Sequence, residues 1–276
     1  MSLRTTPYRS SKRNQAKKPS FTTRPAAPTS WDTASGWYDK LVGDRGHYYH
    51  QHVIVPGVER LLQLTPGSRV LDIGCGQGVF ARVLHKSQSY VGIDASPQLI
   101  ESARQHDHNA RHEYHVADAT KSLPEMHKDF THAVAILSLQ NMADPSGAIR
   151  NVSKHLISHG IFVIVLNHPY FRIPRQSGWG VHEANKQQYR WVTRYLSSMN
   201  IPIAMHPGKR EKGWDTTSFH EPLEAYVRFL AAAGMAIVGL EEWASDKKNQ
   251  PGPHAKREDR AREEIPLFMA IVAKKI

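Results

Sequence analysis

The sequence predicts an α/β fold in which helices cover both faces of a mostly parallel sheet. Short apolar segments alternate with segments of helical spacing from about residue 69 to residue 166. The apolar segments read as short strands buried on both faces, which is typical of parallel sheets flanked by helices. A chain of 276 residues is long enough to bury one such core together with an insertion.

The elements follow one another in a regular order. Helices are expected at 52–64, 79–85, 96–105 and 145–156, and strands at 69–73, 90–93, 112–116, 131–137 and 160–166. Ser96 and Pro97 are typical of a helix start, and Thr65-Pro66-Gly67 separates the first helix from the first strand. The aromatic segment before residue 50 is expected to form helical lead-in segments.

The regular alternation is interrupted at residues 167–219, which are rich in Pro, Gly, Arg, His and aromatic residues. This segment is predicted to be a cap inserted after the fifth strand, or a surface excursion with a small core of its own. A helix is expected at 221–233, with Pro222 in its first turn, and strands at 236–240 and 267–273. Residues 245–264 are charged and lack an apolar face, so they are expected to form a solvated loop.

The first thirty residues differ from the rest of the chain in charge. They hold seven of the basic residues and no acid, so that the net charge of +11 leaves only +4 for the remainder. Several prolines lie among serines and threonines there, a composition that does not fold by itself. We predict a disordered basic tail. A nucleic-acid-binding arm and an organelle transit peptide are the alternatives.

Composition excludes several classes of protein. Cys75 is the only cysteine, so an internal disulfide framework and a thiolate zinc site are both excluded. The sequence contains no run of eighteen apolar residues, and no apolar segment of the secretory type follows its first basic residues. We expect no membrane span and a cytoplasmic location, or an organellar one if the tail is a transit peptide. The sequence leaves the oligomeric state open.

A glycine-rich turn lies where the first strand ends. Gly74, Gly76 and Gly78 allow the backbone to turn tightly and to approach a ligand closely. The helix expected next would present free N–H groups at its start. Asp94 follows Gly74 by twenty residues and ends the second strand, where a carboxylate can accept both hydroxyl protons of a ribose. This arrangement indicates a nucleoside ligand.

A dinucleotide-binding dehydrogenase is the competing interpretation. Its glycines are spaced G-x-G-x-x-G, whereas this chain has G-x-G-x-G. Asp72 lies two residues before the first glycine, and an acid so close would repel a pyrophosphate but would suit a ligand that carries an ammonium group.

The segment 70–80, which contains Asp72 and the three glycines, resembles motif I of class I S-adenosylmethionine (SAM)-dependent methyltransferases, in the branch of ubiquinone and menaquinone biosynthesis enzymes. Segments 116–119, 135–141 and 153–166 resemble the later motifs of that family, in the same order. The resemblance covers about residues 31–166 and the terminal strands. It implies a Rossmann-like sheet of seven strands whose last strand is antiparallel, SAM as the cofactor, and a methyltransferase domain at 31–276.

The resemblance also implies roles for particular residues. Asp94 matches the acid that binds the ribose, Asp118 the acid that binds the adenine amino group, and Tyr38 a tyrosine that closes over the cofactor. The residues expected to bind the cofactor are Tyr38, Asp72, Gly74, Cys75, Gly76, Gly78, Asp94, Ala95, Asp118, Ala119, Leu137 and Gln140.

Histidines near the ends of the later elements are the candidates for a general base. His168 follows the fifth strand and His220 precedes the late helix, and an unperturbed imidazole titrates near neutrality. Asn167-His168-Pro169-Tyr170 is similar to the Asn-Pro-Pro-Tyr element of enzymes that methylate amide or adenine nitrogens, but that element follows the fourth strand and has Pro in second place. We therefore do not infer that substrate class.

The cap combines cations with aromatic rings, which could hold an anionic aromatic small molecule or stack on RNA bases. The residues expected to contact the acceptor are Tyr49, Asn167, Phe171, Arg172, Arg175 and Tyr189. Cys75 is interpreted as a small loop residue rather than a nucleophile. The histidines between His47 and His52 are interpreted as aromatic packing rather than as a metal site, and no metal is expected.

The sequence therefore predicts an enzyme that transfers a methyl group from SAM to a small-molecule acceptor, by O- or C-methylation. An RNA or protein methyltransferase that docks through its basic tail is the alternative. A catalytically inactive fold used for binding is a third interpretation, which the intact glycines and acids disfavour.

Overall fold

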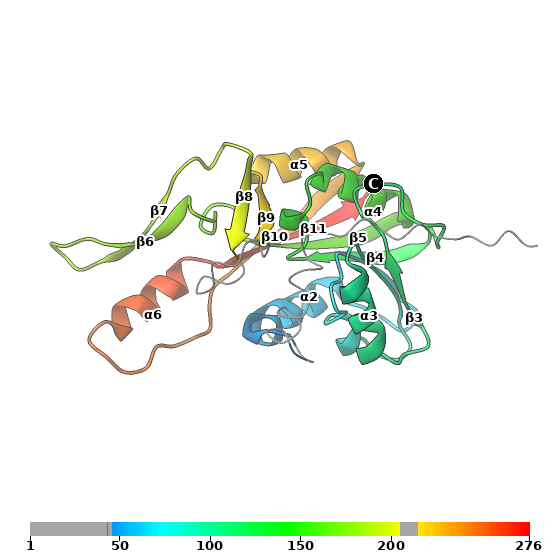
Figure 1. Cartoon of the computed structure of the whole chain (residues 1–276), viewed down its shortest axis with the longest axis horizontal. Coiled ribbons are helices and arrows are strands. Elements are labelled where there is room, and N and C mark those ends of the chain that lie inside the picture. Colours follow the sequence, from blue (N-terminus) through cyan, green and yellow to red (C-terminus); the bar gives the residue numbers. More distant parts are fainter. Residues whose placement is uncertain (1–42, 44–45, 205–214) are drawn as a thin grey trace, which may run out of the picture.

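The computed structural model of the chain describes residues 43, 46–204 and 215–276. Its centre is a seven-stranded sheet with the order β10-β11-β5-β4-β1-β2-β3 (Figure 1). The strands are β1 (Arg69–Ile73), β2 (Ser89–Asp94), β3 (His112–Val116), β4 (Phe130–Ile136), β5 (Leu156–Asn167), β10 (Met235–Trp243) and β11 (Phe268–Lys275). Strands β1 to β5 pair in parallel, and β11 lies antiparallel between β5 and β10. The predicted mostly parallel sheet with an antiparallel last strand is confirmed.

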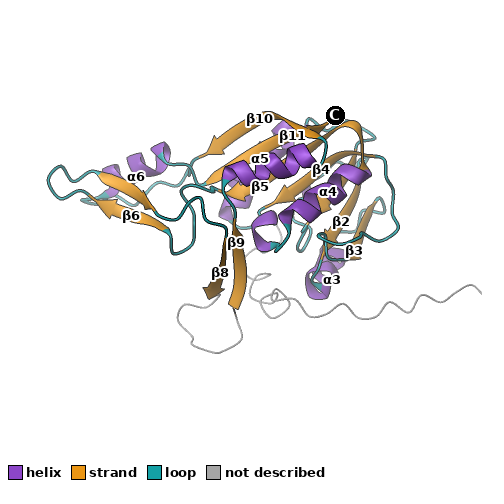
Figure 2. Ribbon diagram, turned by 90° about the horizontal axis from the view of Figure 1, so that it is seen from above, coloured by secondary structure: helices purple, strands orange, loops and turns teal. Residues whose placement is uncertain are grey.

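Helices cover the sheet on both faces. One face packs against α4 (Pro145–His155) and α5 (Leu223–Ala232), and the other against α2 (Val55–Leu62) and α3 (Pro97–His106) (Figures 1 and 2). Neighbouring residues of β1 show the division, since Leu71 belongs to the first core and Val70 to the second, and both are fully buried. Burial on both faces explains why the central strands read as continuous apolar runs.

Two helices start where the sequence contains a capping residue followed by proline. The Ser96 side chain accepts a hydrogen bond from the Leu99 backbone N–H at the start of α3. The Asp144 side chain accepts one from the Gly147 N–H at the start of α4. A capping oxygen satisfies one of the free amides of a first turn, and proline has no N–H that needs a partner there. Helix α2 continues directly from a π-helical turn, η1 (His50–Ile54).

The prediction of a helix at 79–85 is wrong. Only one turn of 3-10 helix, η2 (Ala81–Val83), lies between the glycine turn and β2. The chain turns back toward β2 at once, because the Leu84 backbone is already extended and the Gln88 side chain accepts the His85 N–H.

The loop expected at 245–264 is also partly wrong, because α6 (Ala255–Glu264) occupies its second half. Polar contacts rather than an apolar face hold this helix. Lys248 pairs with Glu263, and the Asn249 side chain donates to Glu258 at 3.0 Å. Of the helix residues, Ala261 alone is buried. Because its contacts are polar, the helix has no apolar periodicity that could predict it from the sequence.

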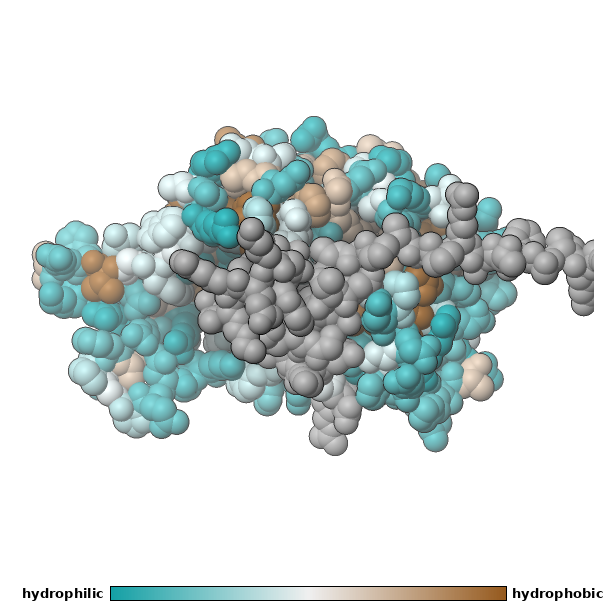
Figure 3. Space-filling view, in the orientation of Figure 1, coloured by the Kyte–Doolittle hydropathy of each residue, from teal (hydrophilic) through white to brown (hydrophobic). Residues whose placement is uncertain are grey.

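The cap segment contains two hairpins that lie outside the main sheet. Strands β6 (Ser177–Val181) and β7 (Gln188–Val192) form one, and β8 (Met199–Ala204) and β9 (Asp215–His220) form the other. The β6–β7 hairpin extends away from the sheet beside α6 and carries an isolated patch of hydrophobic surface (Figures 1 and 3). The β8–β9 hairpin lies over the carboxyl ends of the central strands, beside the turn that follows β4.

Within the described ranges, each helix is too short or too polar to cross a bilayer. The tail at 1–30, Tyr38 and the lead-in segment up to residue 42 lie outside the described residues.

Candidate active site

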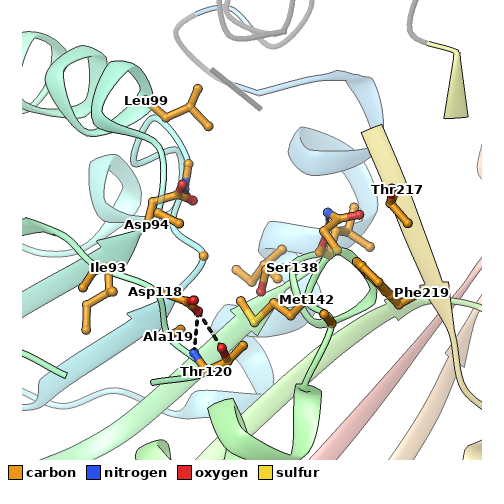
Figure 4. A pocket seen from close by; sticks show the side chains of 18 residues that line it. Ile93, Asp94, Leu99, Asp118, Ala119, Thr120, Ser138, Met142, Thr217 and Phe219 are labelled. Atoms are coloured by element: carbon orange, nitrogen blue, oxygen red, sulfur yellow. Dashed lines mark hydrogen bonds between the residues drawn. The ribbon is translucent and has the colours of Figure 1, made fainter. Parts of the chain in front are cut away.

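A cavity of about 360 Å³ lies at the carboxyl ends of β1 to β4 (Figure 4). Ligands of open α/β sheets bind at this edge, and the volume is within the usual range of small-molecule sites. The turns after the four strands line the cavity with Gly74, Gly76, Ile93, Asp94, Ala95, Leu99, Ala117, Asp118, Ala119, Thr120, Ile136, Leu137, Ser138, Asn141, Met142 and Ala143, and β9 adds Thr217 and Phe219.

The glycine turn forms one wall. Gly74 has a φ of 72° and Gly76 a φ of 55°, values that residues with a side chain rarely adopt. A Cβ atom on Gly74 would lie 2.4 Å from the Cβ of Ser138 on the β4 turn. Glycine is therefore required at position 74 both for its backbone conformation and for close packing against the neighbouring strand.

Asp94 is fixed by the backbone around it. Its Oδ2 accepts the Gly76 N–H at 3.0 Å, and its Oδ1 accepts the Ser96 N–H at 2.9 Å. These two bonds fix the plane of the carboxylate, and each carboxylate oxygen is a group that accepts hydrogen bonds. The carboxylate lines the cavity at the position that the sequence assigned to a ribose.

Asp118 and Ala119 line the cavity beyond β3. The Asp118 Oδ1 accepts hydrogen bonds from the backbone and hydroxyl of Thr120, at 3.0 and 2.6 Å (Figure 4). Its Oδ2 lies 3.0 Å from Lys121 Nζ. Partial burial acts to raise the pKa of Asp118, but these hydrogen bonds and the nearby ammonium outweigh it and lower the pKa. The carboxylate is therefore ionised at neutral pH and available as an acceptor for an amino group.

Asp72 is deeply buried beneath the glycine turn. Its Oδ2 accepts the Tyr90 hydroxyl at 2.7 Å, and its buried Oδ1 has no hydrogen-bond partner among the described residues. Burial, aided by the charge of Asp94 and opposed by the Tyr90 bond, raises the pKa of Asp72 from 3.8 to about 7. Asp72 lines a small cavity of about 40 Å³ that shares Gly74 and Gly76 with the large one. A cationic group reaching this cavity would meet an acid that needs a partner.

The turn after β4 forms the floor of the cavity. Leu137 has a φ of 53°, a strained value for a residue with a side chain, and its carbonyl accepts the Asn141 side-chain amide at 3.1 Å. The Ser138 hydroxyl donates to the Ile73 carbonyl at 2.6 Å and ties this turn to β1. Strain held by such tertiary bonds is common where a site is formed in advance of its ligand.

Several residues of this cavity are not among those expected from the sequence. Ser138 and Asn141 lie within the segment 135–141 that resembles a family motif but were not among the residues expected to bind the cofactor, and Thr120 and Met142 lie in the turns after β3 and β4. Phe219 and Thr217 come from a segment without strand or helix periodicity, and no sequence signal pointed to them. Of the residues expected to bind the cofactor, Gly74, Gly76, Asp94, Ala95, Asp118, Ala119 and Leu137 line the large cavity.

The remaining expected residues lie elsewhere. Cys75 lines the small cavity with Asp72, and burial raises the pKa of its thiol well above the usual range, so a thiolate nucleophile has no support. Gly78 packs against Tyr114, and Gln140 lines a separate cavity on the cap side.

The two candidate bases do not line the large cavity. His168 is buried, with Nε2 at 2.7 Å from Glu242 Oε1, and its Nδ1 accepts the Tyr170 N–H at 3.2 Å. Burial lowers the pKa of His168, although Glu242 opposes the shift. His220 donates from Nε2 to the Tyr195 carbonyl at 2.8 Å. The His168 bond joins the end of β5 to β10, the His220 bond joins β9 to the segment before β8, and neither ring lines the large cavity.

The residues expected to bind the acceptor divide into three groups. Asn167 and Arg172 line a cavity of about 30 Å³ that shares Phe219 with the large one. The Tyr49 hydroxyl lies 3.0 Å from the Ser245 hydroxyl, and its ring packs edge-on against Phe268. The others line neither of these cavities: Phe171 packs against the His168 ring, and Arg175 and Tyr189 are exposed. Among the described residues, no group of three His, Cys, Asp or Glu side chains could hold a metal ion.

Comparison with known proteins agrees with this geometry. Residues 71–164 match the family model described as a methyltransferase domain. A ubiquinone biosynthesis O-methyltransferase of Xylella fastidiosa is 29% identical over 138 residues, which are 48% of this chain and 55% of that protein. A ribosomal protein L11 methyltransferase of Burkholderia vietnamiensis is 37% identical over 78 residues, 28% of this chain and 24% of that protein. The chain thus spans about half the length of the first of these relatives.

A solved structure extends the similarity beyond the matched segment. The S-adenosylmethionine-dependent methyltransferase of Mesorhizobium loti superposes with a TM-score of 0.63 at 25% identity, covering 80% of this chain and 96% of that one. The superposition on that structure, the cavity at the strand ends and the matched family model lead to one conclusion. The chain carries a class I methyltransferase domain of the kind that uses S-adenosylmethionine as its cofactor.

Proposed function

We propose that this protein transfers a methyl group from SAM to a small-molecule acceptor, at an oxygen or a carbon, by in-line displacement. The observation that carries the proposal is the cavity of about 360 Å³, in which a glycine turn, Asp94 and Asp118 converge from three adjacent strands. The glycine turn would accommodate the aminoacyl part of the ligand, Asp94 the ribose and Asp118 the adenine.

The residues present fit SAM. Asp94 places a carboxylate on the cavity wall, a group that can accept ribose hydroxyl protons, and Asp118 is ionised at a place suited to the adenine amino group. Asp72, whose Oδ1 has no partner among the described residues, would pair with the amino group of the methionyl part, near Gly74. SAM supplies a methyl group on a positively charged sulfur, which makes that carbon electrophilic.

The protein's contribution is alignment and exclusion of water. Phe219 and Met142 give the cavity apolar walls opposite Asp94 (Figure 4), and Leu137 adds another apolar residue to the lining. Holding a nucleophile in line with the methyl carbon, in a site closed to solvent, contributes most to a displacement whose leaving group is neutral. Asp94 and Asp118 are the only ionisable groups among the described residues of the lining. We infer that the acceptor ionises by itself or is already nucleophilic.

A small acceptor is favoured because the cap contributes directly to the cavity. Thr217 and Phe219 reach it from β9, so the acceptor would enter beneath a hairpin rather than across an open face. The similarity to ubiquinone biosynthesis O-methyltransferases supports the same class of acceptor.

The test is SAM binding by titration calorimetry with Asp94→Ala. We expect the affinity to fall by roughly 30-fold to 1,000-fold, the loss of two hydrogen bonds to a charged group at about 1–2 kcal/mol each. Asp129→Ala is the matched control. That acid pairs with Arg69 at 2.7 Å at the opposite edge of the sheet, and its removal should leave the affinity within twofold. Equal affinity of the Asp94 variant and wild type would contradict the ribose assignment.

A macromolecular acceptor is the second candidate, and one observation favours it. Tyr189 and Trp191 are exposed at 47% and 41% on the projecting β6–β7 hairpin, where rings could stack on unpaired bases. The similarity to a ribosomal protein methyltransferase keeps a protein acceptor in view as well. Single-stranded RNA binding by the full chain, measured with rising salt, separates the candidates. Salt-sensitive binding that is lost with Tyr189→Ala and Trp191→Ala would favour RNA over a small molecule.

A further inference from the structure

A second, smaller cavity lies on the cap side of the cofactor cavity. It has a volume of about 30 Å³, and Phe219 lines both spaces. Strand β9 and the turn after β4 run between them, since Thr217 and Asn141 line the large cavity whereas Ser218 and Gln140 line the small one. The small cavity has room for about two water molecules, and so for one functional group of a larger ligand.

Unsatisfied polar side chains converge on this cavity. The half-buried Arg172 guanidinium has no carboxylate within ion-pair distance and no side-chain hydrogen bond among the described residues. The Gln140 Oε1 is buried and has no hydrogen-bond partner in the same part of the chain. Buried polar groups are normally satisfied, so the Gln140 oxygen indicates a ligand, and the half-buried Arg172, which has no side-chain partner among the described residues, lines the same cavity as a donor.

The charges around Arg172 make an anion the fitting ligand. Arg172 lies 5.9 Å over the Phe268 ring, and burial lowers its pKa, although the nearby Tyr49 opposes the shift. The charge of Arg172 also acts to lower the pKa of Arg190, so two guanidinium groups are close enough to repel each other. Arg190 is already held, because it donates to the Phe171 carbonyl at 2.7 Å and to the Ser177 hydroxyl at 3.0 Å.

The other polar groups of the lining do not neutralise Arg172. Glu221 is the acid of this lining, and its Oε2 accepts the Ser198 hydroxyl at 2.7 Å instead of pairing with Arg172. His220 donates from Nε2 to the Tyr195 carbonyl. The Asn167 side chain has no hydrogen bond among the described residues and can donate to an incoming oxygen.

We propose that this cavity binds an anionic oxygen group of the methyl acceptor, a carboxylate or a phosphate, on Arg172, with Asn167 as a second donor. Gln140 would receive a hydroxyl or amine proton from the same ligand. Arginine suits this task because its planar donors match the two oxygens of a carboxylate or phosphate. This inference rests on the proposed methyl transfer for the identity of the ligand, but the anion site itself can be tested alone.

The experiment measures the melting temperature of the full chain with 10 mM benzoate, phenyl phosphate or benzamide. Benzamide has the shape of benzoate without its charge. A ligand at ten times its Kd stabilises the fold by about 1.4 kcal/mol, which would raise the melting temperature by roughly 3–5 °C. We expect that rise with benzoate or phenyl phosphate, and none with benzamide. Which anion acts identifies the acceptor as a carboxylate or a phosphate ester.

Two variants locate the effect. Arg172→Gln should abolish the rise, whereas Arg194→Gln, which changes an exposed guanidinium of the same segment, should retain it. Gln140→Glu places a carboxylate on the cavity wall, and it should raise the melting temperature without ligand and abolish the benzoate effect. If Arg172→Gln fails to fold, the Gln140→Glu result decides. Equal effects of benzoate and benzamide, or a benzoate effect that survives both changes, would overturn the proposal.

Calorimetry with SAM keeps this proposal separate from the proposed function. We expect Arg172→Gln to bind SAM within twofold of wild type, because Arg172 does not line the cofactor cavity. Failure of wild type to bind SAM would remove the proposed function and leave the anion site standing. If wild type binds SAM but no anion raises the melting temperature, the anion site is rejected and the proposed function stands.

Discussion

The two sides of the active site are built differently. On the cofactor side, the cavity wall is backbone and short side chains at the ends of parallel strands, and the acids are held by neighbouring amides, as Asp94 is by the N–H groups of Gly76 and Ser96. On the cap side, the walls come from hairpins, and Arg172 and Gln140 line a cavity with groups that lack partners among the described residues.

This difference separates the two binding tasks of a methyltransferase. Apart from the buried Asp72 Oδ1, the acids of the cofactor side are held by neighbouring groups without a ligand, so this side should tolerate little change. The cap side has polar groups without partners among the described residues, so under the proposed anion site we expect it to determine which acceptor binds. Substitutions on the two sides are therefore expected to differ in kind as well as in size.

The largest effect is expected from Gly74→Ala. The new Cβ would lie 2.4 Å from the Ser138 Cβ at a φ of 72°, so strain and overpacking add to a loss of about 2–5 kcal/mol in the free energy of unfolding. Gly67→Ala is the control, since its φ is 84° but nothing lies within 4 Å of the new Cβ. Denaturant unfolding of both variants isolates the clash, and equal losses would show that the glycine turn is not tightly packed.

A smaller effect is expected from Asp72→Asn, and it depends on pH. Because the folded state raises the pKa of Asp72 from 3.8 to about 7, the folded state binds the proton more tightly than the unfolded chain. This contribution to stability is complete below pH 4 and is lost as the pH rises through 7, by at most about 4 kcal/mol. Asp72→Asn should remove that part of the pH dependence, measured as unfolding free energy from pH 4 to 8.

Asp118 is expected to affect the pH dependence of stability in the opposite direction from Asp72. Since the pKa of Asp118 is lowered, its contribution is present at neutral pH and is lost as the pH falls through the lowered pKa, below the usual carboxyl value. Asp118→Asn should therefore leave the profile above pH 5 unchanged in shape. A wild-type profile without a decline between pH 4 and 7 would contradict the environment assigned to Asp72.

The smallest effect is expected on the projecting hairpin. Trp191 covers Gly178 on the paired strand and is 41% exposed, so Trp191→Ala removes one cross-strand contact worth about 1 kcal/mol or less. The melting temperature should fall by a few degrees at most, and the affinity for SAM should stay within twofold. A tenfold loss of SAM affinity would show that this hairpin contributes to cofactor binding, and would contradict the division of the site into a cofactor side and a cap side.

The parts of the molecule that the sequence predicted share one physical basis. Strand β1 was placed correctly because burial on both faces requires a continuous apolar run, and the start of α3 because Ser96 and Pro97 are local signals. Asp94 was found from its position at the end of the second strand, twenty residues after Gly74, and Asp118 from the resemblance of its segment to a motif of the methyltransferase family; both line the cavity. All of these depend on short-range pattern.

What the sequence did not reveal depends on long-range contact. Phe219 reaches the cofactor cavity only because β9 lies beside the turn after β4, which no periodicity indicates. Helix α6 is held by pairs such as Lys248 with Glu263. His168 follows a strand end, yet its ring turns to Glu242 rather than into the cavity. Partner choice of this kind is fixed by tertiary packing.

The single 3-10 turn that replaces a helix after Gly78 affects which ligands the site can distinguish. Dinucleotide-binding sheets hold a pyrophosphate on the aligned amides and partial positive charge of a full helix start. In this chain η2 spans Ala81–Val83 only, and the Gly76 N–H faces Asp94. The phosphates of nucleotide di- and triphosphates would lie near the negative charge of Asp94, without the dipole of a full helix to compensate it. We therefore expect this protein to bind ATP and ADP, which share an adenosine with SAM, only weakly.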